Sequence, residues 1–387
     1  MSKNYQHIQD NNVVKKIILI LYIISLSLGI YSNSMFSWAN NAGAVRRLSI
    51  FLLGILSLVL LSHTLKQYVF FIIGIGITGY SFIIKHASIE YLIIVIIIFS
   101  LSTINPKTIL KFSITFIFLN LLVLVICSKI GWIPNLLFYR GGTLRQSLGT
   151  IYPLAFAAYI FFLCGGYVAI NHGKDKILLQ IFVLILASTF LFKVNGARND
   201  SILTLLMIGS VLSVYIPKRF NKFISIISAV TVFFLSVLSI FITIILPYTT
   251  NLYNSLNIIF NGRLQFQYVV FNYYRPHIFG QLIPEIGLGG SQAPVLNYFY
   301  IDNSYTKLLF MAGIAFTILM YYILITLVRR LIKKDMYKLV YIVLIIILAG
   351  IVEDSFINSS MNIFLTMFMT SGYLLSDSFK EIKLTEE

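Results

Sequence analysis

Residues 247–303 read PYTTNLYNSLNIIFNGRLQFQYVVFNYYRPHIFGQLIPEIGLGGSQAPVLNYFYIDN, and they separate two strongly apolar runs. This stretch is neither apolar nor simply charged, and it carries four of the chain's eight prolines. Its ionisable side chains include Arg263, Arg275, His277, Glu285 and Asp302. Nearly all of the remaining sequence consists of apolar runs and short turns. We therefore expect a membrane-embedded body with one large polar loop, where chemistry in water meets the embedded helices.

The composition defines the class of protein. Hydrophobic residues make up 58% of the 387 residues, charged residues make up only 11%, and the mean hydropathy is +0.90. A soluble domain has about twice this charged fraction, so a soluble protein of this composition could not cover its surface with polar side chains. The net charge of +16 does not indicate a nucleic-acid partner, because the basic residues stand at the ends of apolar runs and not in one patch.

Apolar runs of about 20 residues recur along the chain and predict transmembrane helices. We expect an all-α, polytopic integral membrane protein with a single transmembrane domain over residues 1–387. The first run lacks a small-residue cleavage site after it, which favours a retained helix. About twelve spans are expected, at residues 17–32, 48–63, 68–84, 89–104, 110–128, 151–170, 177–192, 200–216, 223–246, 304–328, 338–352 and 361–376. Residues 247–303 then form one large extracytoplasmic loop between the ninth and tenth spans.

The distribution of lysine and arginine sets the orientation, because cytoplasmic loops carry more positive charge. With the N-terminus inside, 18 of the 29 basic residues fall on the cytoplasmic side and 11 on the other side. Both termini are therefore expected in the cytoplasm. The inner set holds three arginines, whereas the outer set holds seven. Arginine binds phosphate oxygens through a planar fork of donors, so this excess points to an anionic partner. For Arg46 and Arg47 we favour anchoring at lipid headgroups instead.

The first outer candidate is Arg145, in the segment RGGTLRQSLGTIYP at 140–153. Gly141 and Gly142 permit tight turns there. The N-terminus of the next helix would add its positive dipole end, so an anion would meet backbone N–H groups as well as Arg145. A polar loop with a helix cap explains the same residues equally well.

Two further arginines stand at predicted helix starts. Arg198 follows a turn in KVNGARNDSI, where Asn199 or Asp200 is expected to cap the next helix. Arg263 opens the segment 260–274, in which aromatic residues recur at helical spacing and predict an amphipathic helix on the membrane surface. Its aromatic side chains would either anchor the helix at the interface or stack on sugar rings. For both arginines, as for Arg145, we favour an anion-binding role.

Three side chains of the large loop are candidates for acid–base chemistry. Histidine is suited to general-base catalysis, although His277 would more often be a solvated loop residue, and the same holds for Glu285. Asp302 stands where the chain re-enters the membrane. Asp302 or Asn303 is expected to cap the next helix, and the alternative role of Asp302 is to accept a proton from a hydroxyl group. Glu353 and Asp354 form one acidic pair near the outer end of the eleventh span, where they could pair with an outer arginine.

The sequence gives no indication of a cofactor. No His/Cys cluster has metal-ligand spacing, and there is no Asp-x-Asp pair and no Walker motif. The glycines of the GxGxxG pattern at 74–79 lie inside an apolar span, so they favour close helix packing over a dinucleotide site. Cys127 and Cys164 fall in apolar runs and are expected to be buried thiols.

The segment at 140–153, the short outer turn before Arg198, and the loop that opens near Arg263 and closes on DNSY at 302–305 together resemble a known family. It is the Wzy-type polymerase family of O antigens (lipopolysaccharide) and capsular polysaccharides, which is related to the O-antigen ligases. The resemblance covers about residues 140–327. It implies a GT-C-like, metal-independent glycosyltransferase of the bacterial cytoplasmic (inner) membrane, without a cofactor. Its substrates would be undecaprenyl-diphosphate-linked oligosaccharides held in membrane lipid.

The resemblance also implies roles for individual residues. Arg145, Arg198 and Arg263 resemble the outer arginines that handle the diphosphate, and Arg275 is a further candidate from the same loop. Asp302, His277 and Arg263 are the candidates for catalysis. The related ligases usually have histidine where this chain has Asp302, so the identity of the general base stays open between Asp302 and His277, or no strong base is needed.

Three alternatives remain beside a polymerase that joins repeat units on the outer face by inverting glycosyl transfer. An O-antigen ligase-type enzyme would differ in its acceptor. A lipid-linked oligosaccharide flippase or transporter would more often bury charges near the membrane midplane, whereas the charges here gather in outer loops. A non-catalytic scaffold would tolerate substitution of the arginines. A chain-length regulator and a flippase are the expected protein partners of a polymerase.

Overall fold

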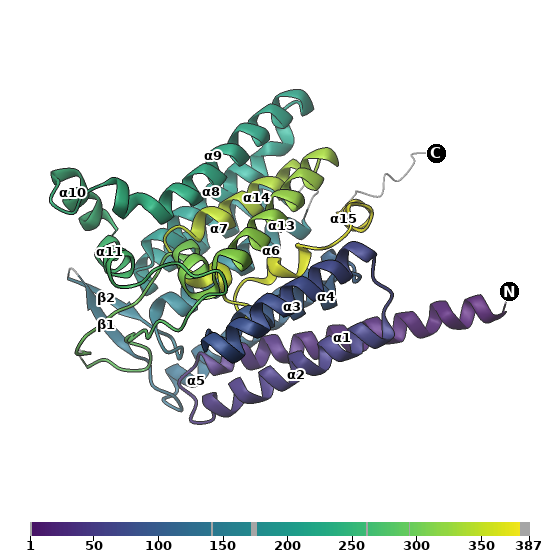
Figure 1. Cartoon of the computed structure of the whole chain (residues 1–387), viewed down its shortest axis with the longest axis horizontal. Helices are drawn as coiled ribbons and strands as arrows, with labels where there is room; N and C mark the ends of the chain where they lie inside the picture. Colours follow the sequence, from purple (N-terminus) through teal and green to yellow (C-terminus); the bar gives the residue numbers. More distant parts are fainter. Residues whose placement is uncertain (1, 141, 172–175, 261, 294, 380–387) are drawn as a thin grey trace.

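The computed structural model of the chain describes residues 2–140, 142–171, 176–260, 262–293 and 295–379 (Figure 1). Gly141, to which the sequence assigns a turn, and the C-terminal residues 380–387 lie outside these ranges. Helices run roughly side by side through the body of the molecule, and they pack around a core of Ile, Leu, Val and Phe side chains.

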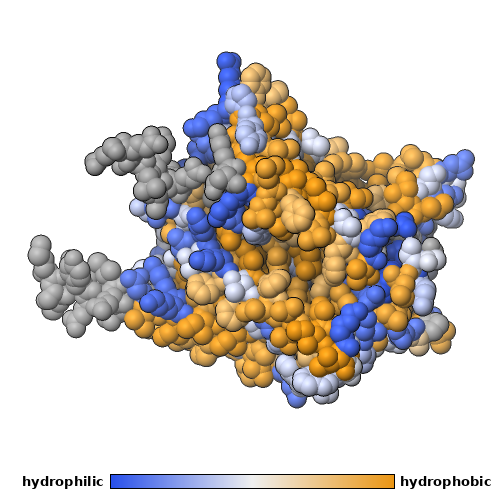
Figure 2. All heavy atoms as spheres, turned by 180° about the vertical axis from the view of Figure 1, so that it is seen from behind, coloured by the Kyte–Doolittle hydropathy of each residue, from blue (hydrophilic) through white to orange (hydrophobic). Residues whose placement is uncertain are grey.

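Eight helices of the described chain are, by length and composition, apolar enough to cross a membrane, which fits the expected helical, multi-pass membrane protein. They are Asn12–Ser32 within α1 (Ser2–Ser32), α2 (Ala39–Leu60), α3 (Leu65–Lys85), α5 (Pro106–Lys129), α6 (Pro153–Ile170), α7 (Ile177–Phe190) with its continuation to Asn195, α9 (Lys218–Ile245) and α13 (Ile314–Lys333). Hydrophobic side chains cover most of the middle of the face in Figure 2, and hydrophilic ones gather toward its two ends. A bilayer would cover such an apolar middle.

Three of the other expected spans are short helices, namely α4 (Glu90–Leu101), α8 (Arg198–Leu212) and α14 (Tyr337–Ala349). The expected number of twelve spans is not confirmed. Residues 361–376 do not form one helix, because they hold a 3₁₀ turn at Ile363–Met367 and the start of α15 (Gly372–Phe379). This segment is apolar because helices surround it. Buried side chains such as Asn362, which accepts from Phe364 N and donates to Phe356 O, satisfy its backbone where a helix does not.

The predictions about the two cysteines and about the glycines at 74–79 are confirmed in part. Cys127 and Cys164 are buried and free. A Cβ at Gly74 would lie 2.8 Å from Val95, so this glycine lets α3 approach α4 closely, as expected. No described atom lies within 4 Å of such a Cβ at Gly76 or Gly79, so these two glycines serve no close contact.

The polar segments gather at one end of the bundle, opposite the end that holds α15 and the start of α1 (Figure 1). The large loop contains α10 (Asn251–Ile259) and α11 (Arg263–Tyr273), followed by irregular chain up to Asn303. Beside it lies a hairpin of β1 (Leu137–Arg140) and β2 (Thr143–Gln146), in which Phe138 is paired with Arg145. This hairpin was not predicted, because the sequence of the region indicated only a polar loop.

The tenth expected span is interrupted near its outer end. After α12 (Ser304–Lys307) and a π-helical turn at Leu308–Ala312, the chain breaks at Gly313, whose φ is 99°. The loop fills this break through its backbone. Ile314 N donates to His277 O at 3.0 Å, and Gln281 N donates to Met311 O at 3.2 Å. The loop is therefore built into the bundle, because it completes the hydrogen bonds that the broken helix leaves open.

Substitution of Gly313 tests this docking. A Cβ at Gly313 would lie 2.3 Å from Gly280 N and 2.6 Å from Ile278 O, and the positive φ adds strain. We expect Gly313→Ala to destabilise the purified protein by about 3 kcal/mol or more. Gly76→Ala is the matched control, because it places the same methyl group in open space within a helix. Equal melting temperatures of the two variants in detergent would contradict the docking.

Candidate functional site

Two adjoining cavities lie at the polar end of the bundle. The larger, of about 410 Å³, is lined by loop residues 287–289, Tyr298 and Tyr300, by the start of α6 and by the chain after α14, and we call it the loop cavity. The smaller, of about 60 Å³, is lined by Arg140, Arg145, Arg198 and Arg263, and we call it the arginine pocket. Leu154, Arg263 and Glu353 line both. The three arginines to which the sequence assigned anion binding are thus brought together, and Arg140 joins them.

Arg145 is held rigidly in the arginine pocket. Its side chain is buried, its Nε donates to Asn195 O at 3.0 Å, and its guanidinium lies 5.5 Å from the centre of the Tyr152 ring. Gly196, with φ of 60°, lies against it so closely that a Cβ there would be 2.7 Å from Arg145 Cγ. The Nη2 atom of Arg145 is buried and has no hydrogen-bond partner among the described residues. A buried, unpaired cationic donor of this kind fits an anionic ligand.

The hairpin and the turn after α7 position this side chain together. Asn195 Nδ2 donates to Gln146 O at 2.9 Å, while the Asn195 carbonyl accepts from Arg145, so the two segments are fixed to each other. Partial burial, reinforced by the charge of Arg145, lowers the pKa of Arg140 from its usual value. Among the described residues, Arg140, Arg145 and Arg198 form no ion pair with a carboxylate. The pocket therefore carries positive charge that the protein does not neutralise.

Arg263 stands between the two cavities and is paired with Asp302. Its Nε lies 3.1 Å from Asp302 Oδ2, and its Nη1 donates to Val352 O. Of the two residues predicted to cap the following helix, Asn303 does so by accepting from Tyr305 N and Thr306 N, and Asp302 does not. Asp302 is thereby left to line the loop cavity. Burial raises its pKa to about 6, while the charge of Arg263 acts in the opposite direction.

Asp200 and Glu353 form a second carboxyl group pair beside Arg263. The prediction that Asn199 or Asp200 caps α8 is wrong, because α8 begins at Arg198 after Ala197 without a side-chain cap. Asp200 is fully buried, Glu353 is 5% exposed, and neither oxygen of Asp200 has a hydrogen-bond partner among the described residues. Burial, together with the charge of Asp200, raises the pKa of Glu353 well above its usual value and favours its protonated form. The sequence showed Glu353 as half of an acidic pair with Asp354, but it also lies close to a carboxyl group on a distant helix.

Glu285 has a structural contact that the sequence did not indicate. Lys307 is buried, and its Nζ lies 3.0 Å from Glu285 Oε2, 2.8 Å from Asp354 Oδ2 and 4.0 Å from the centre of the Tyr300 ring. Glu285 also accepts from Ile301 N at 2.8 Å. These contacts fasten the loop to the ends of α12 and α14, so the geometry gives Glu285 a positioning role.

Arg275 and His277 lie elsewhere in the loop. Both are exposed, and neither is among the residues that line the loop cavity or the arginine pocket. The carbonyl of His277 is used in docking the loop onto α13. The structure therefore brings Arg145, Arg198, Arg263 and Asp302 together, and it places Arg275 and His277 apart from them. Their predicted roles in phosphate binding and catalysis remain predictions without a geometric argument.

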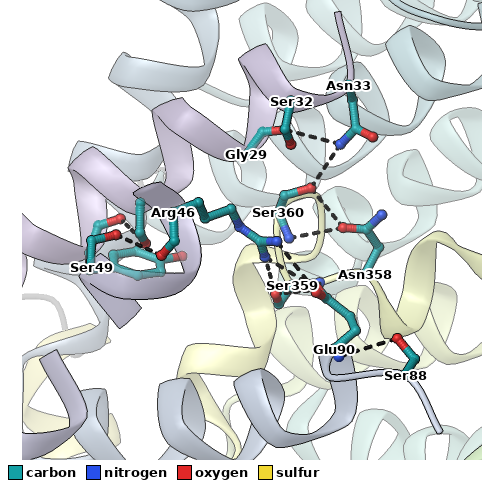
Figure 3. A network of polar contacts seen from close by, with 12 residues as sticks. Gly29, Ser32, Asn33, Arg46, Ser49, Ser88, Glu90, Asn358, Ser359 and Ser360 are labelled. Carbon is teal, nitrogen blue, oxygen red and sulfur yellow. Dashed lines mark hydrogen bonds and ion pairs between the residues drawn. The ribbon is translucent and has the colours of Figure 1, made fainter. Parts of the chain in front are cut away.

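A polar network extends the loop cavity into the bundle (Figure 3). The expectation that Arg46 anchors at headgroups is wrong, since its side chain is buried and pairs with Glu90 at 3.3 Å. Arg46 also donates to Ser359, and Glu90 accepts from Ser359. Ser360 and Asn358 continue the network toward Asn33, and both asparagines line the loop cavity. Arg47 is exposed, as anchoring requires.

Fold and site together define a multi-pass membrane protein with a cationic pocket and a polar cavity side by side at one end. No family model matches the chain, and a search of curated proteins finds no match. Within the described ranges, no group of three or more His, Cys, Asp and Glu side chains is placed to hold a metal ion. The geometry can bind an anion through arginines and can offer carboxyl groups to a neighbouring hydroxyl.

Lys307 provides a test of how the site is held together. Lys307→Met would leave the half-buried Glu285 and Asp354 without their counter-charge, so we expect a loss of about 1–3 kcal/mol of folding free energy. Lys193→Met is the control, because Lys193 is exposed on the turn after α7. Thermal unfolding of the purified proteins measures both. If Lys307→Met loses no more folding free energy than Lys193→Met, the ion pairs of Lys307 do not stabilise the protein.

Proposed function

We propose that the protein is a glycosyltransferase that joins polyprenyl-diphosphate-linked glycans, as a polysaccharide polymerase does. One observation carries the proposal: Arg263 lines both the arginine pocket and the loop cavity and is paired with Asp302. A diphosphate in the arginine pocket would thus lie next to a cavity that has room for a sugar and holds a carboxylate. This arrangement matches a donor whose leaving group is already a diphosphate.

Glycosyl transfer from such a donor needs positive charge at the diphosphate leaving group and a proton acceptor at the attacking hydroxyl group. The acceptor hydroxyl oxygen forms a bond to the anomeric carbon, and the bond from that carbon to the diphosphate oxygen breaks with inversion. The electron pair stays on the diphosphate, where Arg145, Arg198 and Arg263 stabilise it. The proton of the hydroxyl passes to Asp302, whose raised pKa suits a general base. Arg263 links the two events, because it contacts the base and faces the leaving group.

The polar end faces away from the cytoplasm in this proposal. The excess of lysine and arginine on the opposite side supports cytoplasmic termini in a bacterial inner membrane. The donor would be undecaprenyl-diphosphate-linked, and the acceptor would be a second lipid-linked glycan. A chain-length regulator and a flippase are the proposed partners. The buried ion pairs of the site gather near the outer helix ends, which supports surface chemistry over transport through the midplane.

Polymer length in cells lacking their own copy tests the proposal. We expect the deletion to leave single lipid-linked repeats, wild type to restore long polymer, and Arg145→Lys, Arg198→Lys and Asp302→Asn to lower its amount by about tenfold or more, because each removes a charge-assisted or bidentate contact. Arg47→Lys is the matched control, since Arg47 is exposed and remote in sequence. Membrane levels of every variant are measured by immunoblot.

Three results would contradict a polymerase. Single repeats that accumulate on the cytoplasmic face after deletion would indicate a flippase. Long polymer that still forms on its lipid carrier would indicate a ligase. Normal polymer from all three site variants at normal abundance would indicate a scaffold.

The rate of polymer formation in isolated membranes should depend on pH. Asp302 accepts a proton only when ionised, and its pKa is about 6, so the rate should fall about tenfold per pH unit below that value. Between pH 6 and 8 the rate should be nearly constant. Asp335→Asn, on an exposed turn at the other end of the bundle, should leave this profile unchanged. A rate that is equal at pH 5 and pH 7 would exclude Asp302 as the base.

A further inference from the structure

Charge is separated between the two joined cavities. Four arginines and one carboxyl group, that of Glu353, line the arginine pocket. The lining of the loop cavity is the reverse, with three carboxyl groups and one arginine. The carboxyl groups are those of Asp302, Glu353 and Asp354, and the arginine is Arg263. If one ligand carries both an anionic group and a neutral or basic group, the arginine pocket would therefore bind the anionic group and the loop cavity would bind the other.

The protein only partly neutralises the carboxyl groups of the loop cavity. Arg263 is paired with Asp302 at 3.1 Å. Lys307 is the partner of Asp354, but it divides its charge with Glu285. Two carboxylates thus share one ammonium group, and negative charge remains at this wall. A further carboxylate brought in by a ligand would meet like charge in a partly desolvated space, which is unfavourable.

Glu353 is the carboxyl group best placed to contact a ligand. Its side chain lines both cavities and is 5% exposed. Among the described residues, its Oε1 receives no hydrogen bond, and its side chain forms no ion pair. A buried carboxyl group with spare acceptor capacity costs free energy unless a ligand donates to it. Hydroxyl and amino groups of a sugar are suitable donors.

The rest of the loop cavity suits a sugar. Its volume of about 410 Å³ lies within the roughly 300–1,000 Å³ typical of small-molecule sites. Tyr152, Tyr298 and Tyr300 supply aromatic rings and hydroxyls, and Asn33 and Asn358 supply amides. The network of Figure 3 fixes these amides, because Asn33 donates to Ser360, which in turn donates to Asn358. A neutral lining with a negative wall admits polar, uncharged or basic groups.

We propose that the loop cavity selects a neutral or amino-bearing sugar next to the diphosphate and rejects a uronic or otherwise acidic sugar, and that Glu353 determines this specificity. The inference rests on the proposed function, since it takes the diphosphate to occupy the arginine pocket. Glu353 accepts a hydrogen bond from a hydroxyl or ammonium group of the sugar. Asp354 and Asp302 add the like charge that excludes a sugar carboxylate.

Binding of matched probes to the full-length protein in lipid nanodiscs tests this specificity. The probes are a short prenyl diphosphate, either bare or carrying glucose, glucosamine or glucuronic acid, and affinity is measured by titration calorimetry. We expect the bare probe to bind through the arginines. We expect the glucose and glucosamine probes to bind at least about tenfold more tightly than the glucuronic acid probe, because only the last brings a second anion against the carboxyl groups.

Glu353→Gln separates specificity from diphosphate binding. Glutamine keeps the side-chain length and is neutral like a protonated carboxyl group beside Asp200, and its melting temperature shows whether the variant is folded. We expect it to reduce the preference for glucosamine over glucuronic acid by about fivefold or more, because the amide, unlike the carboxyl group, cannot ionise to pair with an ammonium group. Affinity for the bare probe should stay within about twofold. Asp335→Asn, an exposed carboxylate at the far end of the bundle, should change none of these affinities.

The outcomes distinguish the inference from the proposed function. If no diphosphate probe binds, the proposed function fails and the inference fails with it. If the bare probe binds but the three sugar probes bind equally, or the glucuronic acid probe binds most tightly, only the inference fails. A preference that is unchanged in folded Glu353→Gln would also overturn the role of Glu353.

Discussion

The partly buried guanidinium of Arg263 forms the ion pair on which the polar end of the molecule depends. A cation with little access to water needs counter-charge nearby, and Arg263 finds it in Asp302 and close to the Asp200–Glu353 pair. These carboxyl groups come from three places: the end of the large loop, the first turn of α8 and the chain after α14. One cation thus holds together elements that are far apart in sequence, and it joins the two cavities at their common wall.

A second constraint is the satisfaction of backbone groups at the break in the tenth span. The chain at Gly313 leaves the helix, and its free N–H and C=O groups cannot turn to water in a packed membrane protein. Loop residues 277–281 form hydrogen bonds with these groups. The bonds bring the loop so close to the break that the backbones of Gly280 and Gly313 are in contact. The loop that closes the cavity is therefore fixed at its middle by backbone bonds and at its end by Lys307.

The sequence predicted the class of protein and the arginines, but not how charges are paired. Hydropathy reveals membrane helices, and an excess of outer arginine marked Arg145, Arg198 and Arg263, which do lie together. Pairing depends on three-dimensional contacts with no local signal. The sequence did not mark Lys307 as important, and it suggested a headgroup anchor for Arg46, yet both are buried in ion pairs. Residues 361–376 had the apolarity of a span because they are enclosed by protein, which hydropathy cannot separate from enclosure by lipid.

The shortness of α14 has a consequence for the interior of the bundle. Its 13 residues rise about 20 Å, whereas the hydrocarbon layer is about 30 Å thick. α9, with 28 residues, rises about 42 Å. Nearly all side chains of α14 are buried, so other helices surround it and lipid does not. A polar chain can therefore begin within the thickness of the bundle without meeting lipid, and the length of one enclosed helix sets how deep the recess reaches.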